Sequence, residues 1–274
     1  MTLISQTFEK LRIRGEGALI GYVTAGDPEP QLTPRIAEAL VKGGVDILEL
    51  GLPFSDPIAD GPTIQAASVQ ALKAGTTPKM VLRMAGEIKR KCPVPIIIMT
   101  YFNPVFRLGL ERFFRLAKSC GVDGVIVPDL PVEEADGYRK AAAACGVDAI
   151  FLAAPSTTEE RLNKIVECSS GFVYLVSHFG VTGAREKMAE STIQLVKKVL
   201  PHTQGKVPLA VGFGVSKPEH VRAILGAGAD GVIVGSAFVN IISGNRENVD
   251  GMLAELEAAA RRLKAATLAR RRQT

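Results

Sequence analysis

The chain has 274 residues, of which 47% are hydrophobic, so it has enough apolar side chains for a large buried core and lacks the composition of a disordered protein. Its net charge of +5 arises in residues 261–274, which hold six Lys and Arg residues and no acidic residue, and the rest of the chain is close to neutral. A basic stretch confined to one end, with no Trp and 5% aromatic residues overall, argues against a nucleic-acid-binding protein.

The cysteines and the N-terminus indicate a soluble, cytoplasmic protein. Cys92, Cys120, Cys145 and Cys168 are far apart and form no C-x-x-C pair, which is neither metal-site spacing nor the framework of a small secreted domain. The first ten residues lack the apolar run of a signal peptide, and no window approaches the roughly 18 apolar residues of a membrane span. We therefore expect reduced thiols and no membrane contact.

Helical and strand-like segments alternate along the chain. Helical spacing of apolar residues predicts a helix over 3–13, and an apolar run predicts a strand over 18–23. A phrase of the form Gly-Val-Asp or Gly-Ala-Asp then occurs four times, each time after a helical segment and before an apolar run. Its copies begin at Gly44, Gly121, Gly146 and Gly228. A glycine stop, a short turn and a buried strand are typical of the helix-to-strand join in a parallel sheet.

Further apolar runs at 95–100, 172–177 and 207–211 bring the predicted strands to eight. The predicted helices between them cover 32–42, 63–74, 78–90, 110–119, 132–144, 158–168, 189–199, 217–226 and 248–264. This alternation predicts an α/β fold, a (β/α)₈ TIM barrel with an extra N-terminal helix. No linker divides the chain, so we expect one domain over 1–274, with 261–274 as a basic, frayed C-terminal tail. The alternative is an open doubly wound sheet, but no G-x-G-x-x-G follows the first strand.

Two carboxylates lie together in the segment from Asp46 to Gln65. Glu49 interrupts the apolar strand Ile47 to Leu50, and period-two alternation places it on the same face as Ile47. Asp60 lies in the loop that follows, before a helix opens near residue 63. A buried carboxylate costs several kcal/mol unless it is paired or neutralised, and ligands bind at the carboxyl ends of strands in such folds. A structural acid at 49 and turn-forming acids in the loop are the alternative reading.

Three glycine-containing loops follow the sixth, seventh and eighth predicted strands. They read H-F-G-V-T-G-A over 178–184, G-F-G-V-S over 212–216 and V-G-S-A-F over 234–238. Glycine lets backbone N–H groups approach an anion, and a helix N-terminus favours negative charge. Ser236, at the start of a helix, is expected to cap it, to donate to phosphate, or both. The loops predict a site for a small phosphate ester.

Other residues on the same rim have open roles. His178 is either a general base or phosphate contact or a solvent-facing histidine, and Tyr174 points into the mouth or packs in the core. Asp129 follows the fourth strand and is either a site residue or a cap. No His, Cys or Asp cluster has metal spacing, so we expect no metal.

The run L-E-L-G-L-P-F-S-D-P-I-A-D-G-P-T-I-Q-A-A resembles the signature of the tryptophan synthase alpha-subunit family. The likeness extends along nearly the whole chain, through G-Y-V-T-A-G-D-P, M-T-Y-F-N-P, V-P-D-L-P-V-E-E, G-V-T-G-A, G-F-G-V-S and V-G-S-A-F. It implies a barrel that cleaves indole-3-glycerol phosphate to indole and glyceraldehyde 3-phosphate, a retro-aldol reaction without a metal or organic cofactor.

The resemblance also implies roles for particular residues. Glu49 would be the acid/base group, Asp60 would hold the indole N–H and stabilise the positive charge on the ring, and Tyr174 would lie near the reacting atoms. The positions that match the family's phosphate contacts are Gly183, Gly212, Gly214, Gly235 and Ser236. A carboxylate whose pKa is raised by apolar surroundings can both remove and deliver a proton near neutral pH, which fits the role of Glu49.

A partner is implied as well. The loop bearing Asp56 and the rim around Pro53 resemble the surface that meets the beta subunit in an α₂β₂ heterotetramer, to which indole passes through a tunnel. Pyridoxal phosphate is expected only in that partner. One departure is that Ser177 is followed by His178 where the family usually has arginine, so loop closure or its coupling to the partner is expected to differ.

Three alternatives remain at this stage. The nearest is a free-standing indole-3-glycerol-phosphate lyase that releases indole. A different phosphate-binding barrel, such as a sugar-phosphate isomerase or epimerase, is disfavoured by the loop that contains Glu49 and Asp60. A catalytically silent binding subunit is disfavoured by the presence of both acids.

Overall fold

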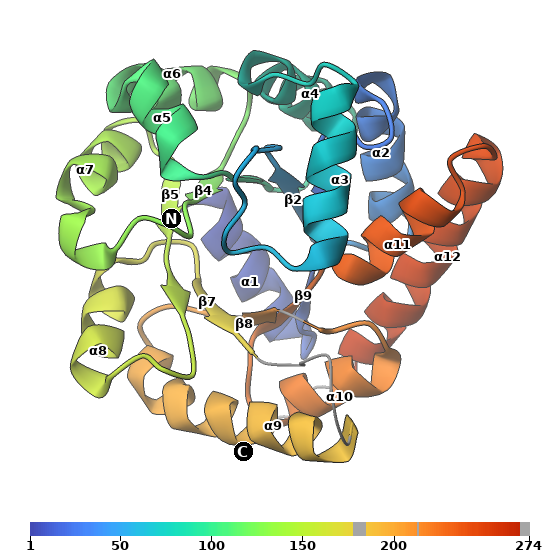
Figure 1. Ribbon diagram of the computed structural model, residues 1–274. Helices are drawn as coiled ribbons and strands as arrows, with labels where there is room; N and C mark the ends of the chain where they lie inside the picture. Colours follow the sequence, from blue (N-terminus) through green and yellow to red (C-terminus); the bar gives the residue numbers. More distant parts are fainter. Residues whose placement is uncertain (178–184, 213, 269–274) are drawn as a thin grey trace.

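The computed structural model describes residues 1–177, 185–212 and 214–268. No helix within these ranges is long and apolar enough to cross a bilayer. The sequence prediction of helices around a central parallel sheet is confirmed (Figure 1).

The strands form one parallel sheet with the order β5-β4-β3-β2-β1-β9-β8-β7-β6. They are β1 (Ala18–Thr24), β2 (Ile47–Gly51), β3 (Ile96–Met99), β4 (Gly124–Ile126), β5 (Asp148–Ile150), β6 (Leu152–Ala153), β7 (Val173–Val176), β8 (Leu209–Gly212) and β9 (Gly231–Val234). Only Phe151 separates β5 from β6, the two ends of the order, and its carbonyl accepts a hydrogen bond from the backbone N–H of Tyr174 at 3.0 Å. The two segments are therefore one interrupted strand that closes the barrel, and the prediction of eight strands is confirmed.

Helices surround the barrel, and α1 lies behind the ring of strands (Figure 1). The described residues contain α1 (Leu3–Arg14), α2 (Thr33–Lys42), α3 (Pro62–Lys73), α4 (Pro78–Lys91), α5 (Phe102–Leu108), α6 (Leu110–Ser119), α7 (Asp136–Ala144), α8 (Glu159–Cys168), α9 (Arg185–Thr203), α10 (Pro218–Gly226), α11 (Ser236–Gly244) and α12 (Val249–Thr267), with 3₁₀ turns at Pro30–Leu32 and Val132–Glu134.

The boundaries differ from the prediction in three places. Helix α5 was not predicted, because it is short and contains a proline, which is tolerated only because it lies in the first turn. The helix predicted over 132–144 begins with a 3₁₀ turn, and α7 proper starts at Asp136. Residues 261–267, assigned to the basic tail, form the end of α12, where Leu263, Ala266 and Thr267 are buried.

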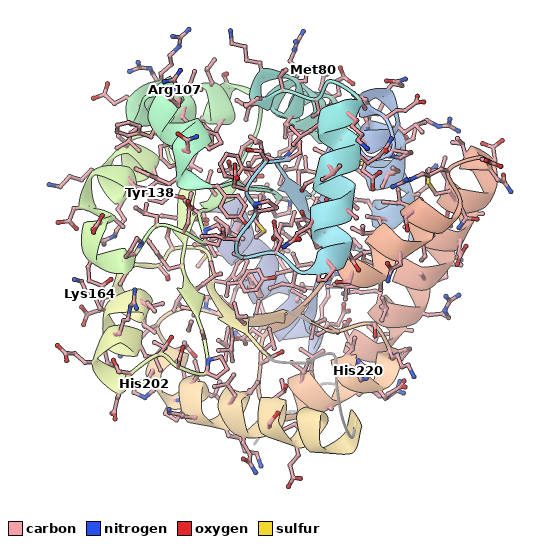
Figure 2. The ribbon with its side chains drawn as sticks, viewed as in Figure 1. Met80, Arg107, Tyr138, Lys164, His202 and His220 are labelled. Carbon is pink, nitrogen blue, oxygen red and sulfur yellow. The ribbon has the colours of Figure 1, made fainter. Side chains whose placement is uncertain are left out.

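The barrel has an inner core and an outer core. Alternation along each strand sends Ile20 and Ile47 into the barrel, while neighbours such as Leu48 pack against the helices. Helix α1 closes the N-terminal end, with Ile4 and Phe8 in the inner cluster. A Cβ at Gly124 would lie 2.8 Å from the Ile4 side chain, so a residue without a side chain is needed there. Charged side chains such as those of Arg107 and Lys164 lie at the periphery (Figure 2).

The repeated Gly-x-Asp phrase has a structural role at the N-terminal ends of the strands. In three of the four copies the Asp side chain accepts a hydrogen bond from a backbone N–H of the preceding strand: Asp46 from Leu19 at 2.8 Å, Asp123 from Ile96 at 2.9 Å, and Asp230 from Leu209 at 2.9 Å. The fourth, Asp148, is the first residue of β5 itself.

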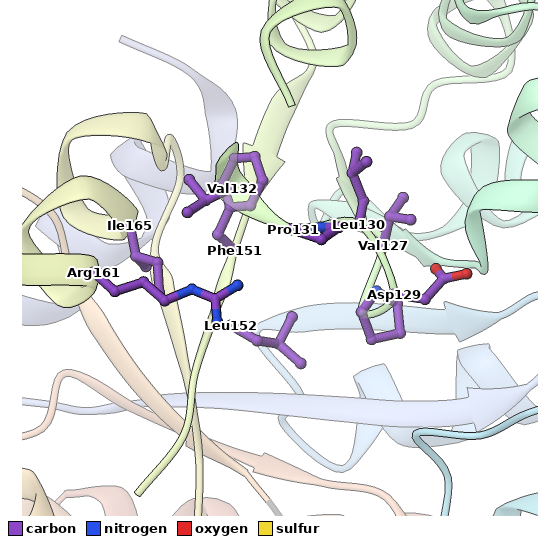
Figure 3. Close-up of a pocket in the computed structure, with 10 residues that line it drawn as sticks. Val127, Asp129, Leu130, Pro131, Val132, Phe151, Leu152, Arg161 and Ile165 are labelled. Carbon is purple, nitrogen blue, oxygen red and sulfur yellow. The ribbon is translucent and has the colours of Figure 1, made fainter. Parts of the chain in front are cut away.

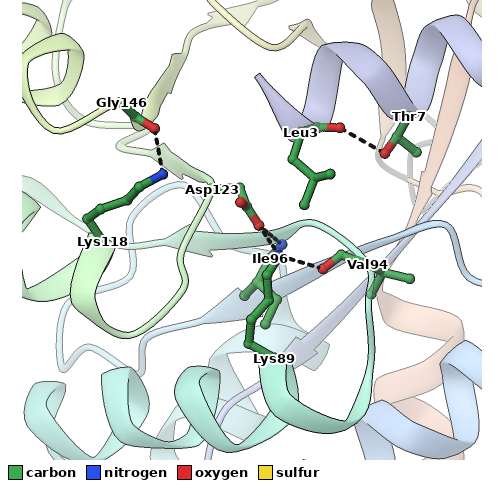
Figure 4. Close-up of polar contacts among 8 residues, drawn as sticks. All are labelled: Leu3, Thr7, Lys89, Val94, Ile96, Lys118, Asp123 and Gly146. Atoms are coloured by element: carbon green, nitrogen blue, oxygen red, sulfur yellow. Dashed lines mark hydrogen bonds and ion pairs between the residues drawn. The ribbon is translucent and has the colours of Figure 1, made fainter. Parts of the chain in front are cut away.

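Lysine side chains from the outer helices reinforce two of these joins. The ammonium of Lys89, on α4, lies 2.7 Å from Asp123 and also donates to the carbonyl of Val94 (Figure 4). The ammonium of Lys264, on α12, lies 2.9 Å from Asp46 in the same way. These contacts hold adjacent strands together at one end of the barrel, which leaves the opposite end for the site.

Candidate active site

Glu49 lies on β2 with its side chain inside the barrel. It is fully buried, and neither carboxylate oxygen has a hydrogen-bond partner within the described ranges. Burial, and to a smaller extent the negative charge of Asp60, raises its pKa to about 8. Glu49 is therefore mostly a neutral carboxylic acid at pH 7, with both oxygens free for a ligand.

Asp60 lies in the loop between β2 and α3, at the C-terminal mouth of the barrel. Its Oδ2 accepts a hydrogen bond from the hydroxyl of Tyr101 at 3.1 Å. Burial raises the pKa of Asp60 to about 6, while the hydrogen bond from Tyr101 acts in the opposite direction. At neutral pH Asp60 is thus mostly ionised while Glu49 is mostly protonated. When the pKa values of two carboxyl groups are separated in this way, the protonated group can donate a proton while the ionised group stabilises a positive charge.

Two tyrosines that point inward from other strands complete this part of the mouth. Tyr22 on β1 pairs in register with Glu49, and its hydroxyl lies 3.2 Å from the hydroxyl of Thr24. Tyr174 on β7 is buried, and burial followed by the charge of Glu49 raises its pKa well above the ordinary value. Tyr174 was predicted from the sequence as a candidate for the mouth, but Tyr22 was not. Strand alternation could have identified Tyr22, because it places Tyr22 on the same face as Thr24 at the C-terminal end of the first strand.

Glycines make room for both tyrosine rings. A Cβ at Gly51 would overlap the Tyr22 hydroxyl, and a Cβ at Gly212 would overlap the Tyr174 hydroxyl. The packing of the Tyr174 ring therefore requires a glycine at position 212, independently of any ligand that the Gly212 backbone binds. Its carbonyl also accepts a hydrogen bond from the Ser177 hydroxyl at 2.8 Å, which ties the ends of β7 and β8 together.

The predicted phosphate-binding positions lie at the ends of neighbouring strands. Gly212 ends β8, Gly214 follows with a positive φ of 78°, and Gly235 lies between β9 and α11. Ser236 is the first residue of α11 and the N-cap is Gly235, so of the two roles predicted for Ser236 the capping role is not found, and the role as a phosphate contact stays a prediction. The free N–H groups at the start of a helix remain suited to an anion. Gly183 and His178 lie outside the described residues.

Asp129 has a structural partner. Its Oδ1 accepts a hydrogen bond from the backbone N–H of Phe102 at 2.8 Å, which holds the start of α5. Asp129 also lines a cavity of about 140 Å³ with Leu152 and Arg161 (Figure 3), and Arg161 forms an ion pair with Glu133 at 3.2 Å. The geometry thus favours the capping role for Asp129 that the sequence analysis left open.

Tyr101 was also missed from the sequence. It follows the C-terminal end of β3, so its place on the rim of the barrel mouth could be read from the predicted strand, but its contact with Asp60 could not. Across the parts of the chain that the structure describes, no group of three or more His, Cys, Asp and Glu side chains is placed to hold a metal ion. The mouth thus combines one neutral acid, one carboxylate and three tyrosine hydroxyls with helix and glycine backbone suited to an anion.

Comparisons with known proteins agree with this site. The family model described as "Tryptophan synthase alpha chain" matches residues 8–268. The tryptophan synthase alpha chain of Solibacter usitatus is 49% identical over 264 residues, which cover 96% of this chain and 97% of that protein. The crystal structure of the alpha subunit from Legionella pneumophila superposes with a TM-score of 0.88 at 36% identity, covering 97% of this chain and 98% of that one.

A second solved structure comes from a complex. The matching chain of the tryptophan synthase α₂β₂ complex of Pyrococcus furiosus has a TM-score of 0.85 at 43% identity, covering 91% of this chain and 98% of that chain. Sequence and structure agree over nearly the full length in each comparison. The chain belongs to the tryptophan synthase alpha chain family.

Proposed function

We propose that this chain cleaves indole-3-glycerol phosphate to indole and glyceraldehyde 3-phosphate, and that indole passes to a beta subunit for tryptophan synthesis. The observation that supports this most strongly is Glu49, a fully buried acid with no partner for either oxygen within the described ranges, whose pKa is raised in part by the charge of a second carboxylate, Asp60. An unpartnered buried carboxyl group is destabilising, so its presence inside the barrel supports a functional role.

Glu49 would carry the proton in both directions. In its neutral form it gives its proton to the ring carbon that bears the glycerol chain, which places a positive charge on the indole ring. The bond between that carbon and the glycerol chain then breaks, its electron pair returns to the ring, and the adjacent hydroxyl becomes the aldehyde. The hydroxyl proton returns to Glu49, which regenerates the acid. A pKa of about 8 suits a group that must give and take a proton near neutral pH.

Asp60 would act on the ring nitrogen. In its ionised form it accepts a hydrogen bond from the indole N–H and stabilises the positive charge that develops when the ring carbon is protonated. With a pKa of about 6 it is ionised at the pH where Glu49 is still protonated. Tyr174, held beside Gly212 and coupled to Glu49 by charge, would lie near the reacting atoms and exclude water from them.

The phosphate would bind at the other side of the mouth, on the backbone of Gly183, Gly212, Gly214 and Gly235 and on Ser236. The start of α11 supports this assignment, because its first N–H groups have no partner within the helix. All proton transfers in this scheme use Glu49, so the scheme needs neither a metal nor an organic cofactor in this chain, and pyridoxal phosphate would belong to the beta partner.

The partner would bind over the rim around the mouth. Ile58 is 83% exposed in the loop that contains Asp60, and Phe106 on α5 is 67% exposed. Asp56 is exposed on the same loop, while Pro53 is buried beneath it. Exposed apolar side chains beside a catalytic mouth are suited to a subunit that receives the product. The Pyrococcus furiosus relative, whose structure is described as that of an α₂β₂ complex, supports a beta partner for this chain.

The test is indole release from indole-3-glycerol phosphate by the purified chain, with and without an added beta subunit. Slow release that the beta subunit accelerates is expected. Fast release that the beta subunit does not change would indicate the free-standing lyase instead. No release under either condition would contradict the proposed chemistry and would return attention to other phosphate-binding barrels.

A further inference from the structure

We propose that Tyr101 is a positioning residue for Asp60, whose hydroxyl holds the carboxylate in the place where the reaction needs it. This inference rests on the proposed function, in which ionised Asp60 contacts the substrate ring. Tyr101 itself is not required to touch the substrate.

The hydroxyl of Tyr101 makes two directional hydrogen bonds to the same loop. It accepts from the backbone N–H of Ala59 at 3.0 Å and lies 3.1 Å from Oδ2 of Asp60. A carboxylate can only accept, so the hydroxyl proton must point to Asp60 once the backbone N–H occupies an oxygen lone pair. One side chain therefore fixes both the loop backbone and the carboxylate that the loop presents.

The ring of Tyr101 is itself held on two sides. It stacks on Phe54 from the same loop, with ring centroids 5.1 Å apart and an interplanar angle of 23°. The next residue, Phe102, is tied through its backbone N–H to Asp129 at 2.8 Å. These contacts restrict rotation of the ring away from Asp60. The hydroxyl is thus preorganised, and a preorganised donor stabilises a charge better than a mobile one.

The groups around Asp60 make the hydrogen bond from Tyr101 important for its charge. Glu49 faces Asp60 from β2, Tyr22 faces it from β1 and Tyr174 from β7, and none of these side chains is a cation. Burial disfavours the ionised form of Asp60, and among the described residues the Tyr101 hydroxyl is the group that acts against this by lowering its pKa. The bond therefore affects both the geometry and the charge of Asp60.

The decisive variant is Tyr101→Phe, with Tyr138→Phe as its matched control. Tyr138, on α7 outside the barrel (Figure 2), also donates a buried hydroxyl hydrogen bond, to the carbonyl of Val125 at 3.1 Å. Both variants keep the aromatic ring and lose one hydroxyl. Thermal unfolding of the two establishes that each is folded before activity is compared.

In Tyr101→Phe we expect kcat for indole release to fall by about ten- to a hundredfold with a smaller change in KM, since a hydrogen bond to a charged group is lost where charge develops. The acid limb of the pH profile should move to higher pH, because the bond that favours ionised Asp60 is gone. Tyr138→Phe should keep the wild-type kcat and the wild-type acid limb.

A direct readout separates this inference from the proposed function. The titration of Asp60, followed by ¹³C NMR of labelled aspartate in the protein and assigned with Asp60→Asn, should show a higher pKa in Tyr101→Phe than in the wild type. An unchanged Asp60 titration would overturn the positioning role even if the wild type cleaves the substrate. A raised pKa together with a wild type that releases no indole would keep the Tyr101–Asp60 contact and reject the proposed reaction.

Discussion

The hydroxyl of Tyr22 occupies the space that Gly51 leaves by having no side chain. Both residues lie at the C-terminal ends of adjacent strands, where Tyr22 pairs with Glu49 and Thr24 pairs with Gly51. The Tyr174 and Gly212 pair has the same arrangement across β7 and β8. On two sides of the mouth, a glycine on one strand thus allows a tyrosine from the neighbouring strand to lie within reach of the charge of Glu49.

Gly51→Ala should lower kcat/KM strongly, because the new methyl group would displace the Tyr22 ring beside Glu49. Adding Tyr22→Phe should restore part of the activity, since the phenolic oxygen is the closest atom, although the ring carbons at 2.6 and 2.8 Å remain tight. Kinetics of the two single variants and the double variant measure this coupling. Gly86→Ala on α4 is the control, because its Cβ would meet nothing closer than 3.7 Å. Additive effects of Gly51→Ala and Tyr22→Phe would contradict the packing argument.

The pH dependence of kcat/KM should be bell-shaped, with limbs near pH 6 and pH 8. Below the lower limb Asp60 is protonated and no longer stabilises positive charge, and above the upper limb Glu49 has lost the proton that it must deliver. The upper limb depends on the charge of Asp60, since ionised Asp60 disfavours ionisation of Glu49. Steady-state rates between pH 5 and 9 test this. Activity that keeps rising through pH 8 would mean that Glu49 acts first as a base.

Glu49→Gln should abolish cleavage while it makes stability less dependent on pH. A carboxyl group whose pKa is raised on folding stabilises the native state below its unfolded pKa, and this contribution is lost as the pH rises through the folded pKa. The free energy of unfolding of the wild type should therefore decrease between pH 5 and 8. Between pH 5 and pH 8, the free energy of unfolding of Glu49→Gln should therefore rise relative to that of the wild type by of the order of 1–4 kcal/mol. Denaturant unfolding at several pH values measures it, and parallel curves for the two proteins would contradict the assignment.

Part of the site could be predicted because it lies within one stretch of chain. Glu49 and Asp60 are on a strand and on its following loop, and strand alternation alone places Glu49 inside with Ile47. Tyr101 contacts Asp60 across 41 residues of sequence, so only the pairing of β2 with β3 in the sheet brings the two together. The contribution of Tyr22 depends on a register that local patterns do not specify.

Some boundaries of the helices and strands could likewise be predicted from local sequence, while others could not. The Gly-x-Asp phrase predicted the joins correctly, because each is a local unit of helix end, turn and strand. The interruption of the fifth strand at Phe151 lies within a continuous apolar run, which contains no turn residue to indicate it. The extent of α12 depends on the burial of Leu263 and Ala266 against the barrel helices, which the basic residues around them obscured.

Asp123→Ala should destabilise the barrel without changing the chemistry. It leaves the N–H of Ile96 and the ammonium of Lys89 without their carboxylate, and we expect a loss of about 2–3 kcal/mol in the free energy of unfolding. Indole release should stay at the wild-type rate, because these residues lie at the end of the barrel opposite the mouth. Asp250→Ala is the control: its side chain is 93% exposed in the pair with Arg35, so its removal should change stability by less than about 1 kcal/mol. Equal losses in the free energy of unfolding of the two variants would contradict the stabilising role of Asp123 at the join between helix and strand.

Ile58→Ser should weaken binding of the beta subunit. The side chain is 83% exposed beside the mouth, and covering such a residue in an interface is worth about 1–2 kcal/mol, or roughly a tenfold change in Kd. Indole release by the isolated chain should be unchanged, which separates the loss of partner binding from damage to Asp60 in the same loop. Ile13→Ser is the matched control, because Ile13 is 67% exposed on α1 at the closed end of the barrel and should not contact the partner. Calorimetric titration of each variant with the beta subunit measures the difference. Equal affinities for Ile58→Ser and Ile13→Ser would place the interface away from the loop that holds Asp60.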